Sequence, residues 1–160
     1  MRLVSNRGNT TGPNPMRENS PAYILETLQK GFYVKIDVTV VDKVIFLGAY
    51  FTVNLDFIQN EKIICQASDG LTLHFLMSNQ IHCFFQQKDN YSITTQGWIW
   101  TYPENILTPL SICVMPEWFL KDVQEASKLK CYGICSNYIE YIPKPYVPPL
   151  ETISEYFEKI

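Results

Sequence analysis

The sequence predicts an α/β fold, and more specifically a small, reduced (β/α) barrel of the TIM type. Short apolar runs rich in β-branched and aromatic residues alternate with segments that carry helix start and stop signals, which is typical of parallel β/α units. The chain has 160 residues, of which 46% are hydrophobic, enough for one domain with a core. Because TIM-type barrels usually have about 250 residues, several helices must be missing or very short. The pattern also allows an open, doubly wound sheet in place of a closed barrel.

Seven apolar runs, most of them four to eight residues long, are predicted to be β-strands. They are 2–6, 32–41, 62–68, 82–87, 97–102, 111–117 and 131–139. A further run, 43–51, is expected to pair locally with the second strand or to lead away from it. Only a short polar segment separates 82–87 from 97–102, so at least one crossover lacks a full helix.

The segment 20–31 is predicted to be the first helix. Ser20 is a good N-cap, Pro21 suits the first helical position, and Gly31 is a C-terminal stop. The apolar stripe of this helix is expected to consist of Ile24, Leu25 and Leu28.

Two further helices are predicted at 69–79 and 116–130. The second of them has acidic residues early and lysines late, which suits the helix dipole. We therefore predict a barrel domain over 1–142. The remaining residues, 143–160, form a proline-rich arm followed by an amphipathic C-terminal helix, and such an arm is expected to bind a protein partner or a larger assembly.

Composition excludes several classes of protein. The net charge is −3, which argues against a broad nucleic-acid surface, and no apolar run approaches the ~20 residues that cross a membrane. The five cysteines include no CxxC pair, so neither a disulfide framework nor a zinc knuckle is expected. Buried free thiols are typical of a reducing compartment, and we expect an intracellular, cytoplasmic protein.

Polar residues follow the predicted strands at the ends where a (β/α) barrel does its chemistry. Side chains alternate along a strand, so Lys35 and Asp37 share one face of 32–41, and this polar face should point to the barrel axis. The other strands contribute further polar residues to the same end, many of them amides. These are Asn6, Arg7, Gln66, one of Gln86 and Gln87, Glu117, Ser136 and Asn137.

Histidine is nearly absent from this predicted barrel mouth. His74 lies on the helix 69–79, where it is expected to cap or pack. His82 begins a strand, at the end opposite an active site. Metal-dependent phosphodiester cleavage needs converging carboxylates together with a group that titrates near neutral pH, usually histidine. There is also no GxSxG motif for a serine nucleophile.

The stretches "LVSNRGN", "ENSPAYILETLQKGFYVKIDV" and "FLGAY" resemble the opening of the glycerophosphodiester phosphodiesterase family. The similarity is to its short, divergent branch in phages and large DNA viruses. "GWIWTYP", "SICVMPE" and "GICSN" are similar to later strands of that branch, so the resemblance covers most of positions 3–140. It implies a TIM-type barrel that cleaves phosphodiesters with a divalent metal and two histidines.

Several positions of the family motif are retained in this chain. The resemblance implies that Arg7 and Gly8 correspond to the first strand's "RG", and that Glu18 corresponds to the acid of the "EN" pair. Asp37 corresponds to the aspartate of the "E-x-D" metal pair on the second strand.

The residues that carry the family's catalytic chemistry are replaced in this chain. The first catalytic histidine falls at Asn6, and the second, from a "GHD" motif, falls at Ala49. The glutamate of "E-x-D" has become Lys35, and a polar position on the third strand reads Gln66. By resemblance, both proton-transfer groups and one metal ligand are missing.

Three functions remain open on these residues. The first is a catalytically inactive barrel, or pseudoenzyme, that serves as a binding or structural module, and is expected to need no cofactor. In it Lys35 replaces the metal by pairing with Glu18 and Asp37, with Arg7 nearby. The relatives come from viral genomes, so we expect a virion or virus-factory component. The expected binding residues are Arg7, Glu18, Lys35, Asp37, Gln66 and Glu117.

The second function is a divergent hydrolase in which Glu18, Asp37 and Glu117 hold Mg²⁺ or Ca²⁺. The third is an unrelated binder of a small ligand or sugar phosphate. It would use Arg7 and Lys35 together with a set of aromatic residues at the mouth. These aromatic residues are Tyr50, Trp98, Trp100 and Tyr102.

Overall fold

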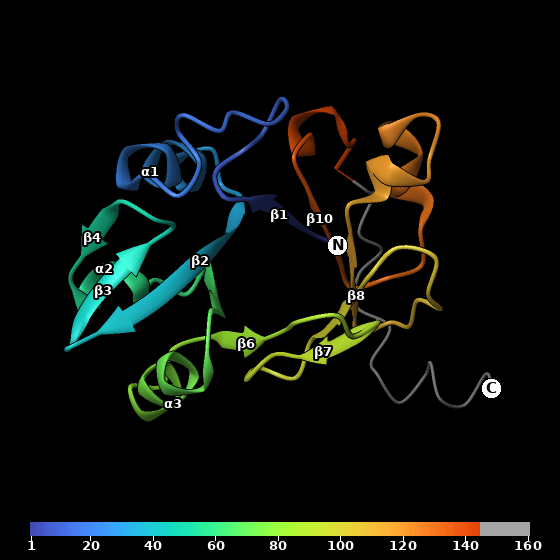
Figure 1. Ribbon diagram of the computed structural model, residues 1–160. Coiled ribbons are helices and arrows are strands. Elements are labelled where there is room, and N and C mark those ends of the chain that lie inside the picture. Colours follow the sequence, from blue (N-terminus) through green and yellow to red (C-terminus); the bar gives the residue numbers. More distant parts are fainter. Residues whose placement is uncertain (145–160) are drawn as a thin grey trace.

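The protein folds as a mixed α/β structure built on one curled sheet with few helices (Figure 1). The structure is a computed structural model that describes residues 1–144. The predicted C-terminal helix, and all of the arm except Pro143 and Lys144, lie outside these described residues. Within residues 1–144 the sheet has ten strands. It curls so that β1 and β10 lie above and β6 and β7 lie below in the view of Figure 1.

Seven strands follow one another in parallel, in the order β6-β5-β2-β1-β10-β9-β8. Each lies inside one of the seven predicted runs, which confirms those predictions. Their bounds are β1 Arg2–Asn6, β2 Tyr33–Val41, β5 Ile63–Ala67, β6 Cys83–Phe85, β8 Ile99–Thr101, β9 Ser111–Val114 and β10 Gly133–Ser136. Parallel strands bring their carboxyl ends to one edge, and that edge holds the site described below.

Three short antiparallel strands complete the sheet. The run 43–51 begins a hairpin: β3 (Val44–Leu47) pairs with the far half of β2, and β4 (Phe51–Val53) pairs with β3. The β2–β3 turn consists of Asp42 and Lys43, which both have positive φ, as a tight two-residue hairpin requires. The third strand, β7 (Tyr91–Ile93), pairs with β8 and falls in the polar segment where no element was predicted.

The first two predicted helices are present. Helix α1 (Pro21–Gln29) begins where the Ser20 side chain accepts a hydrogen bond from Tyr23 N. Helix α3 (Gly70–Ser78) begins where the Asp69 carboxylate accepts one from Thr72 N, at 2.7 Å. A one-turn helix, α2 (Leu55–Ile58), was not predicted.

The third predicted helix, 116–130, is wrong. The segment forms two short 3₁₀ helices, η1 (Pro116–Trp118) and η2 (Val123–Lys128). The reason lies in the spacing of its apolar residues, which recur every third position and pack into one cluster. A period of three matches the 3₁₀ helix and not the 3.6 residues of an α-helix. These residues are Leu120, Val123, Ala126 and Leu129. A third 3₁₀ turn, η3 (Ile139–Tyr141), follows β10.

Apolar side chains pack on both sides of the curled sheet. Inside the curl, Val4, Phe84, Trp100 and Ile112 belong to one buried cluster. Outside, a second cluster lies between the sheet, α1, α3 and the β3–β4 hairpin.

The predicted stripe of α1 is only partly correct. Ile24 is fully buried, but Leu25 is 47% exposed. The buried neighbour is instead Thr27, whose hydroxyl donates to Gly8 O at 2.9 Å. That hydrogen bond ties the helix to the loop after β1, which carries part of the site.

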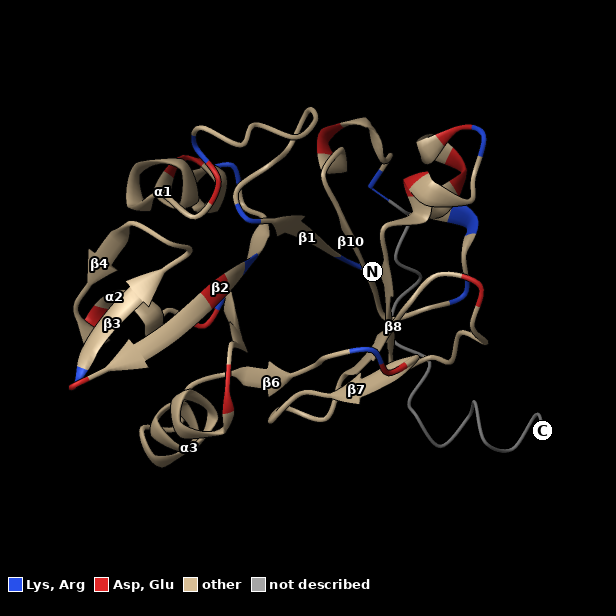
Figure 2. Ribbon diagram, in the orientation of Figure 1, with Lys and Arg blue, Asp and Glu red and all other residues tan. Residues whose placement is uncertain are grey.

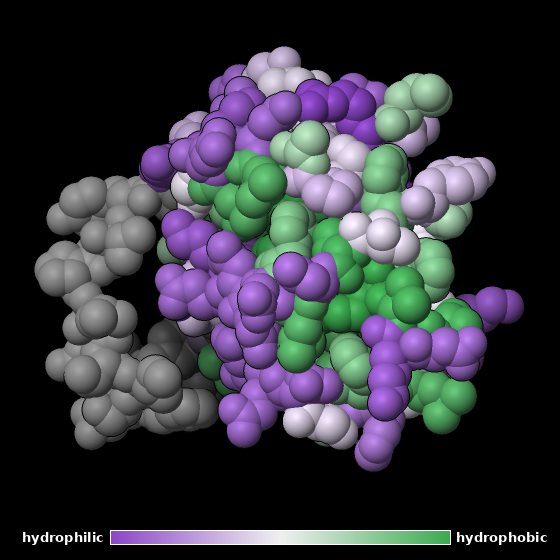
Figure 3. All heavy atoms as spheres, turned by 90° about the vertical axis from the view of Figure 1, so that its left-hand side faces the viewer, coloured by the Kyte–Doolittle hydropathy of each residue, from purple (hydrophilic) through white to green (hydrophobic). Residues whose placement is uncertain are grey.

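The outer face over α1, the hairpin and α3 carries a group of apolar side chains bordered by polar ones (Figure 3). The exposed apolar residues on these elements include Leu25, Val44 and Met77. All five cysteines are free thiols, four of them buried, as predicted. No helix among residues 1–144 is long and apolar enough to cross a membrane.

Gly133 on β10 is a tight point of this sheet. A Cβ there would lie 2.8 Å from both Arg2 O and Ile112 Cδ1. We expect Gly133→Ala to lower the free energy of unfolding by about 1–3 kcal/mol in urea denaturation, because a packed core resists an added methyl group. Gly70→Ala is the matched control: nothing lies within 4 Å of its Cβ, so that variant should keep or slightly raise the stability. Equal stabilities for both variants would contradict this packing.

Candidate functional site

A cavity of about 390 Å³ opens at the carboxyl ends of the parallel strands. Its lining is mostly polar and comes from β1 and the loop after it, from β2, β5 and β9, and from the segments that follow β8, β9 and β10. The lining residues are Asn6, Arg7, Pro13, Glu18, Lys35, Asp37, Gln66, Tyr102, Val114, Met115, Trp118 and Asn137. Of the predicted binding residues, this cavity brings together Arg7, Glu18, Lys35, Asp37 and Gln66, and it leaves out Glu117.

Strand alternation and register place the charges of β2 in this cavity. Lys35 lies opposite Asn6 of β1, and Asp37 lies opposite Gln66 of β5. Lys35 is only 5% exposed, so its ammonium is withdrawn from bulk water. In Figure 2 most of the sheet is uncharged, while β2 carries both signs of charge. A buried ammonium is stable only beside a partner of opposite charge.

Asp37 is that partner, and it is also shared with two other side chains. Lys35 Nζ lies 2.6 Å from Asp37 Oδ1, and Arg7 Nε lies 2.6 Å from Oδ2. The Arg7 contact is an ion pair by distance, because its Nε–H is not aligned for a hydrogen bond. Asn19 Nδ2 donates to Oδ2 at 3.1 Å, while Asn19 Oδ1 accepts from Asp37 N at 2.9 Å.

Arg7, and not Lys35, joins the two carboxylates. Arg7 Nη1 lies 3.2 Å from Glu18 Oε2, and the same guanidinium pairs with Asp37. The expectation that Lys35 pairs with both acids is therefore wrong for Glu18, whose other oxygen accepts from Asn9 Nδ2 at 2.8 Å. The reason is the backbone: Arg7 has a φ of 60°, and its N–H donates to Lys35 O, which holds the residue beside β2.

These contacts decide the charge of Asp37. Burial alone would raise the pKa of its carboxyl group, but the charges of Lys35 and Arg7 and the hydrogen bonds from Lys35 and Asn19 outweigh burial and hold the pKa below its usual value. For Arg7, burial acts to lower the pKa, and the charges of Asp37 and Glu18 more than compensate, so the pKa is raised. Both groups are therefore ionised at neutral pH.

Amide side chains connect the charged residues to β10. Asn137 Oδ1 accepts from Asn6 Nδ2 at 3.0 Å and from Asn9 Nδ2 at 2.9 Å. Asn9 thus bridges Asn137 and Glu18. Neither Asn9 nor Asn19 was predicted as a site residue, although both are in the motifs "NRGN" and "EN" that carry the family resemblance.

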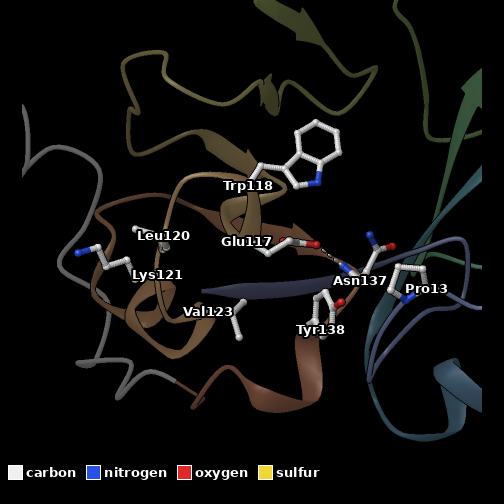
Figure 4. A pocket seen from close by; sticks show the side chains of 8 residues that line it. All are labelled: Pro13, Glu117, Trp118, Leu120, Lys121, Val123, Asn137 and Tyr138. Carbon is white, nitrogen blue, oxygen red and sulfur yellow. Dashed lines mark hydrogen bonds between the residues drawn. The ribbon is translucent and has the colours of Figure 1, made fainter.

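Glu117 lies in a neighbouring cavity of about 410 Å³ (Figure 4). Its carboxylate accepts hydrogen bonds from Ser136 Oγ at 2.8 Å and from Asn137 N at 3.0 Å. Glu117 therefore fixes the loop after β10, and the expectation that it lies with Glu18 and Asp37 is wrong.

The predicted mouth aromatics divide into three kinds. Tyr102 lines the 390 Å³ cavity as expected. Trp98 and Trp100 are buried in the cluster inside the sheet, and Tyr50 is 89% exposed in the turn after β3. Ala49, beside Tyr50, is also exposed and lines neither cavity.

Both histidines lie away from the cavity. His74 is exposed on α3, and neither cap of that helix uses its side chain, so the expectation that it caps or packs is wrong. His82 precedes β6 at the amino end of the sheet, as predicted, and its ring contacts Trp98 edge-on with centroids 4.5 Å apart. Burial lowers the pKa of His82 to about 4.

The carboxylates do not fit the divalent metal that the family resemblance implies. Every carboxylate oxygen of Glu18, Asp37 and Glu117 already contacts a nitrogen or hydroxyl donor. Two of those donors are cations, which repel a metal ion. In residues 1–144 there is no group of three His, Cys, Asp or Glu side chains placed to hold a metal.

Comparisons of the chain with models of protein families, with curated proteins and with solved structures gave no match. The resemblance to the glycerophosphodiester phosphodiesterase family therefore stays a prediction from the sequence motifs. What the site can do chemically follows from its own contacts.

Arg7→Met is expected to lower the free energy of unfolding at pH 7 by about 1–2 kcal/mol, because Glu18 and Asp37 lose their shared cation. The lowered pKa of Asp37 contributes stability above the unfolded-state value, and this contribution is lost as pH falls through the folded-state pKa. The variant should therefore show a flatter dependence on pH below about 4. Lys88→Met, which removes an exposed cation that forms no ion pair within residues 1–144, is the control and should leave both quantities unchanged.

His82 generates a second, separate dependence on pH. In the unfolded chain the histidine binds a proton below about pH 6.5, whereas folded His82 stays neutral down to about pH 4. The free energy of unfolding should therefore decrease as the pH is lowered from about 6.5 to about 4. The slope is at most about 1.4 kcal/mol per pH unit. Urea titrations of His82→Phe should lose this slope, while His74→Gln should retain it. An unchanged slope in His82→Phe would show that another group is responsible.

Proposed function

We propose that this chain is a catalytically inactive phosphodiesterase-like protein that serves as a binding or structural module. The observation that carries the proposal is the ion-pair network of Lys35, Arg7, Asp37 and Glu18. Two cationic side chains neutralise the two acids that the family resemblance assigns to the metal. An assembly role in a virus is supported by the sequence resemblance alone.

We also propose that the curled sheet is a reduced barrel of the TIM type. Seven parallel strands in sequence around the curl support this proposal. The gap between β6 and β8 is bridged by the segment after β7, where Thr95 N donates to Cys83 O at 2.9 Å. Phe84, Trp100 and Ile112 fill the interior, as side chains do in a barrel core.

The polar side chains of the cavity lack the proton chemistry of a hydrolase. General acid and base groups each contribute typically 10²- to 10⁴-fold to a rate. Asn6 and Gln66 have amide side chains, which do not titrate, and the pKa of Asp37 is held low. Binding energy without proton transfer supports recognition of a ligand more than its cleavage.

Two measurements on the full-length protein test the loss of catalysis. Calorimetry with millimolar Mg²⁺ or Ca²⁺ should give no saturable binding, because Lys35 and Arg7 oppose a divalent ion. Hydrolysis of bis(4-nitrophenyl) phosphate with added metal should not exceed that of Glu18→Gln. Turnover that disappears in Glu18→Gln would overturn the proposal in favour of a divergent metal-dependent hydrolase. A variant combining Asn6→His with Lys35→Glu adds a histidine and an acid to the lining of the 390 Å³ cavity and is the positive control, in which metal binding should appear.

A further inference from the structure

The two cavities at the carboxyl end of the sheet adjoin one another. The 390 Å³ cavity and the 410 Å³ cavity share three lining residues, Pro13, Trp118 and Asn137. Trp118 is 67% exposed, and in Figure 4 its ring stands clear of the ribbon beside Glu117. Each cavity has the size of a small-molecule site, about 300–1,000 Å³. Trp118 therefore lies at the border between the two cavities.

Polar groups of the deeper cavity have unused hydrogen-bonding capacity. Lys35 is 5% exposed and has three N–H donors, yet within residues 1–144 it contacts a single acceptor, Asp37. Asn6 donates through Nδ2 to Asn137, and no described residue donates to its Oδ1. The amide of Gln66 likewise has no partner among the described residues. Lys35 and Asn6 are buried residues and Gln66 is half-buried, and all three line the cavity, where a polar ligand can bind to their free donors and acceptors.

The charges of the site favour a neutral ligand over a phosphate. Arg7 and Lys35 carry two positive charges, and Glu18 and Asp37 carry two negative charges at contact distance. The cavity therefore has no excess positive charge to bind an anion. Nor does it offer a strand edge to an extended peptide, because β1, β2, β9 and β10 are all paired on both sides.

We propose that the two cavities form one cleft that binds a neutral oligosaccharide. The exposed ring of Trp118 packs against the C–H groups on the apolar face of one sugar. The hydroxyls of the next sugar accept from Lys35 and donate to Asn6. This inference rests on the proposed function: if the protein is catalytically inactive, the cleft binds the oligosaccharide without cleaving it.

Backbone strain around the deeper cavity supports a preformed binding site. Arg7 has a φ of 60°, Met115 of 49° and Asn19 of 62°, although none of them is glycine. Arg7 and Met115 line the cavity, and Asn19 holds Asp37. Such conformations cost about 1–3 kcal/mol each and persist where the surrounding structure fixes them, often at ligand sites.

Tryptophan fluorescence gives a direct test, because Trp98 and Trp100 are 7% and 1% exposed and Trp118 is the exposed indole. Maltotriose, chitotriose and mannotriose are the probes, with inorganic phosphate and glycerol 3-phosphate as charged comparisons. We expect at least one trisaccharide to shift the emission to shorter wavelength and the two anions to leave it unchanged.

Calorimetry then compares variants with the unmodified protein. Trp118→Ala and Lys35→Met should each weaken trisaccharide binding about tenfold or more, which corresponds to about 1.4 kcal/mol. Tyr50→Ala removes a side chain that is 89% exposed and lines neither cavity, so binding should be unchanged. Circular dichroism of each variant confirms that it is folded.

The proposal is overturned if none of the three trisaccharides binds at millimolar concentration, or if Trp118→Ala binds as tightly as the unmodified protein. It is also overturned if only the two anions bind. These outcomes are distinct from a failure of the proposed function. Sugar binding together with metal-dependent hydrolysis would overturn the proposal of a pseudoenzyme and support the proposal of a sugar-binding cleft. Absence of both sugar binding and hydrolysis would overturn the cleft proposal and leave the pseudoenzyme proposal standing.

Discussion

The ionised carboxylate of Asp37 is the contact on which the whole carboxyl end of the sheet depends. Its side chain pairs with Lys35 on the same strand and with Arg7 from the loop after β1. Its backbone N–H donates to Asn19, before α1, and its carbonyl accepts from Gly48, after β3. One residue therefore fixes the relative positions of β1, β2, α1 and the hairpin, and its charge must be compensated for any of them to hold.

Compensation can come from a metal ion or from cationic side chains, and the two solutions exclude each other. A carboxylate withdrawn from water costs several kcal/mol unless an opposite charge lies close to it. Here Lys35 is nearly buried at 2.6 Å, and Arg7 lies at the same distance on the other oxygen. The internal cations keep the two acids charged, so the acids need no ion from solution to compensate their charge.

Sequence reasoning found the strands and two helices because their signals are local: β-branched runs, the Ser20–Pro21 helix start and the Asp69 cap. Alternation also correctly placed Lys35 and Asp37 in one cavity. Arg7 was missed as the joining cation because its position depends on a left-handed backbone, which periodicity does not reveal. The prediction of a helix at 116–130 was wrong because it relied on the acidic residues early and the lysines late in the segment. The apolar residues of the segment recur every three positions, which does not match an α-helix. Asn9 and Asn19 contribute through contacts between segments that no spacing rule predicts.

The two ends of the curled sheet are built differently. This difference explains how the polar residues of the cavity can be substituted without loss of the fold. At the amino end, the Arg2 guanidinium lies 4.2 Å from the Tyr132 ring centre and 5.4 Å from that of Trp98, and Tyr33 packs edge-on against Trp98. These contacts bury rings and close the interior. The carboxyl end instead holds strained backbone and polar groups with unused capacity. Substitutions there leave in place the packed end and the parallel ladder, which form the framework that positions Asp37.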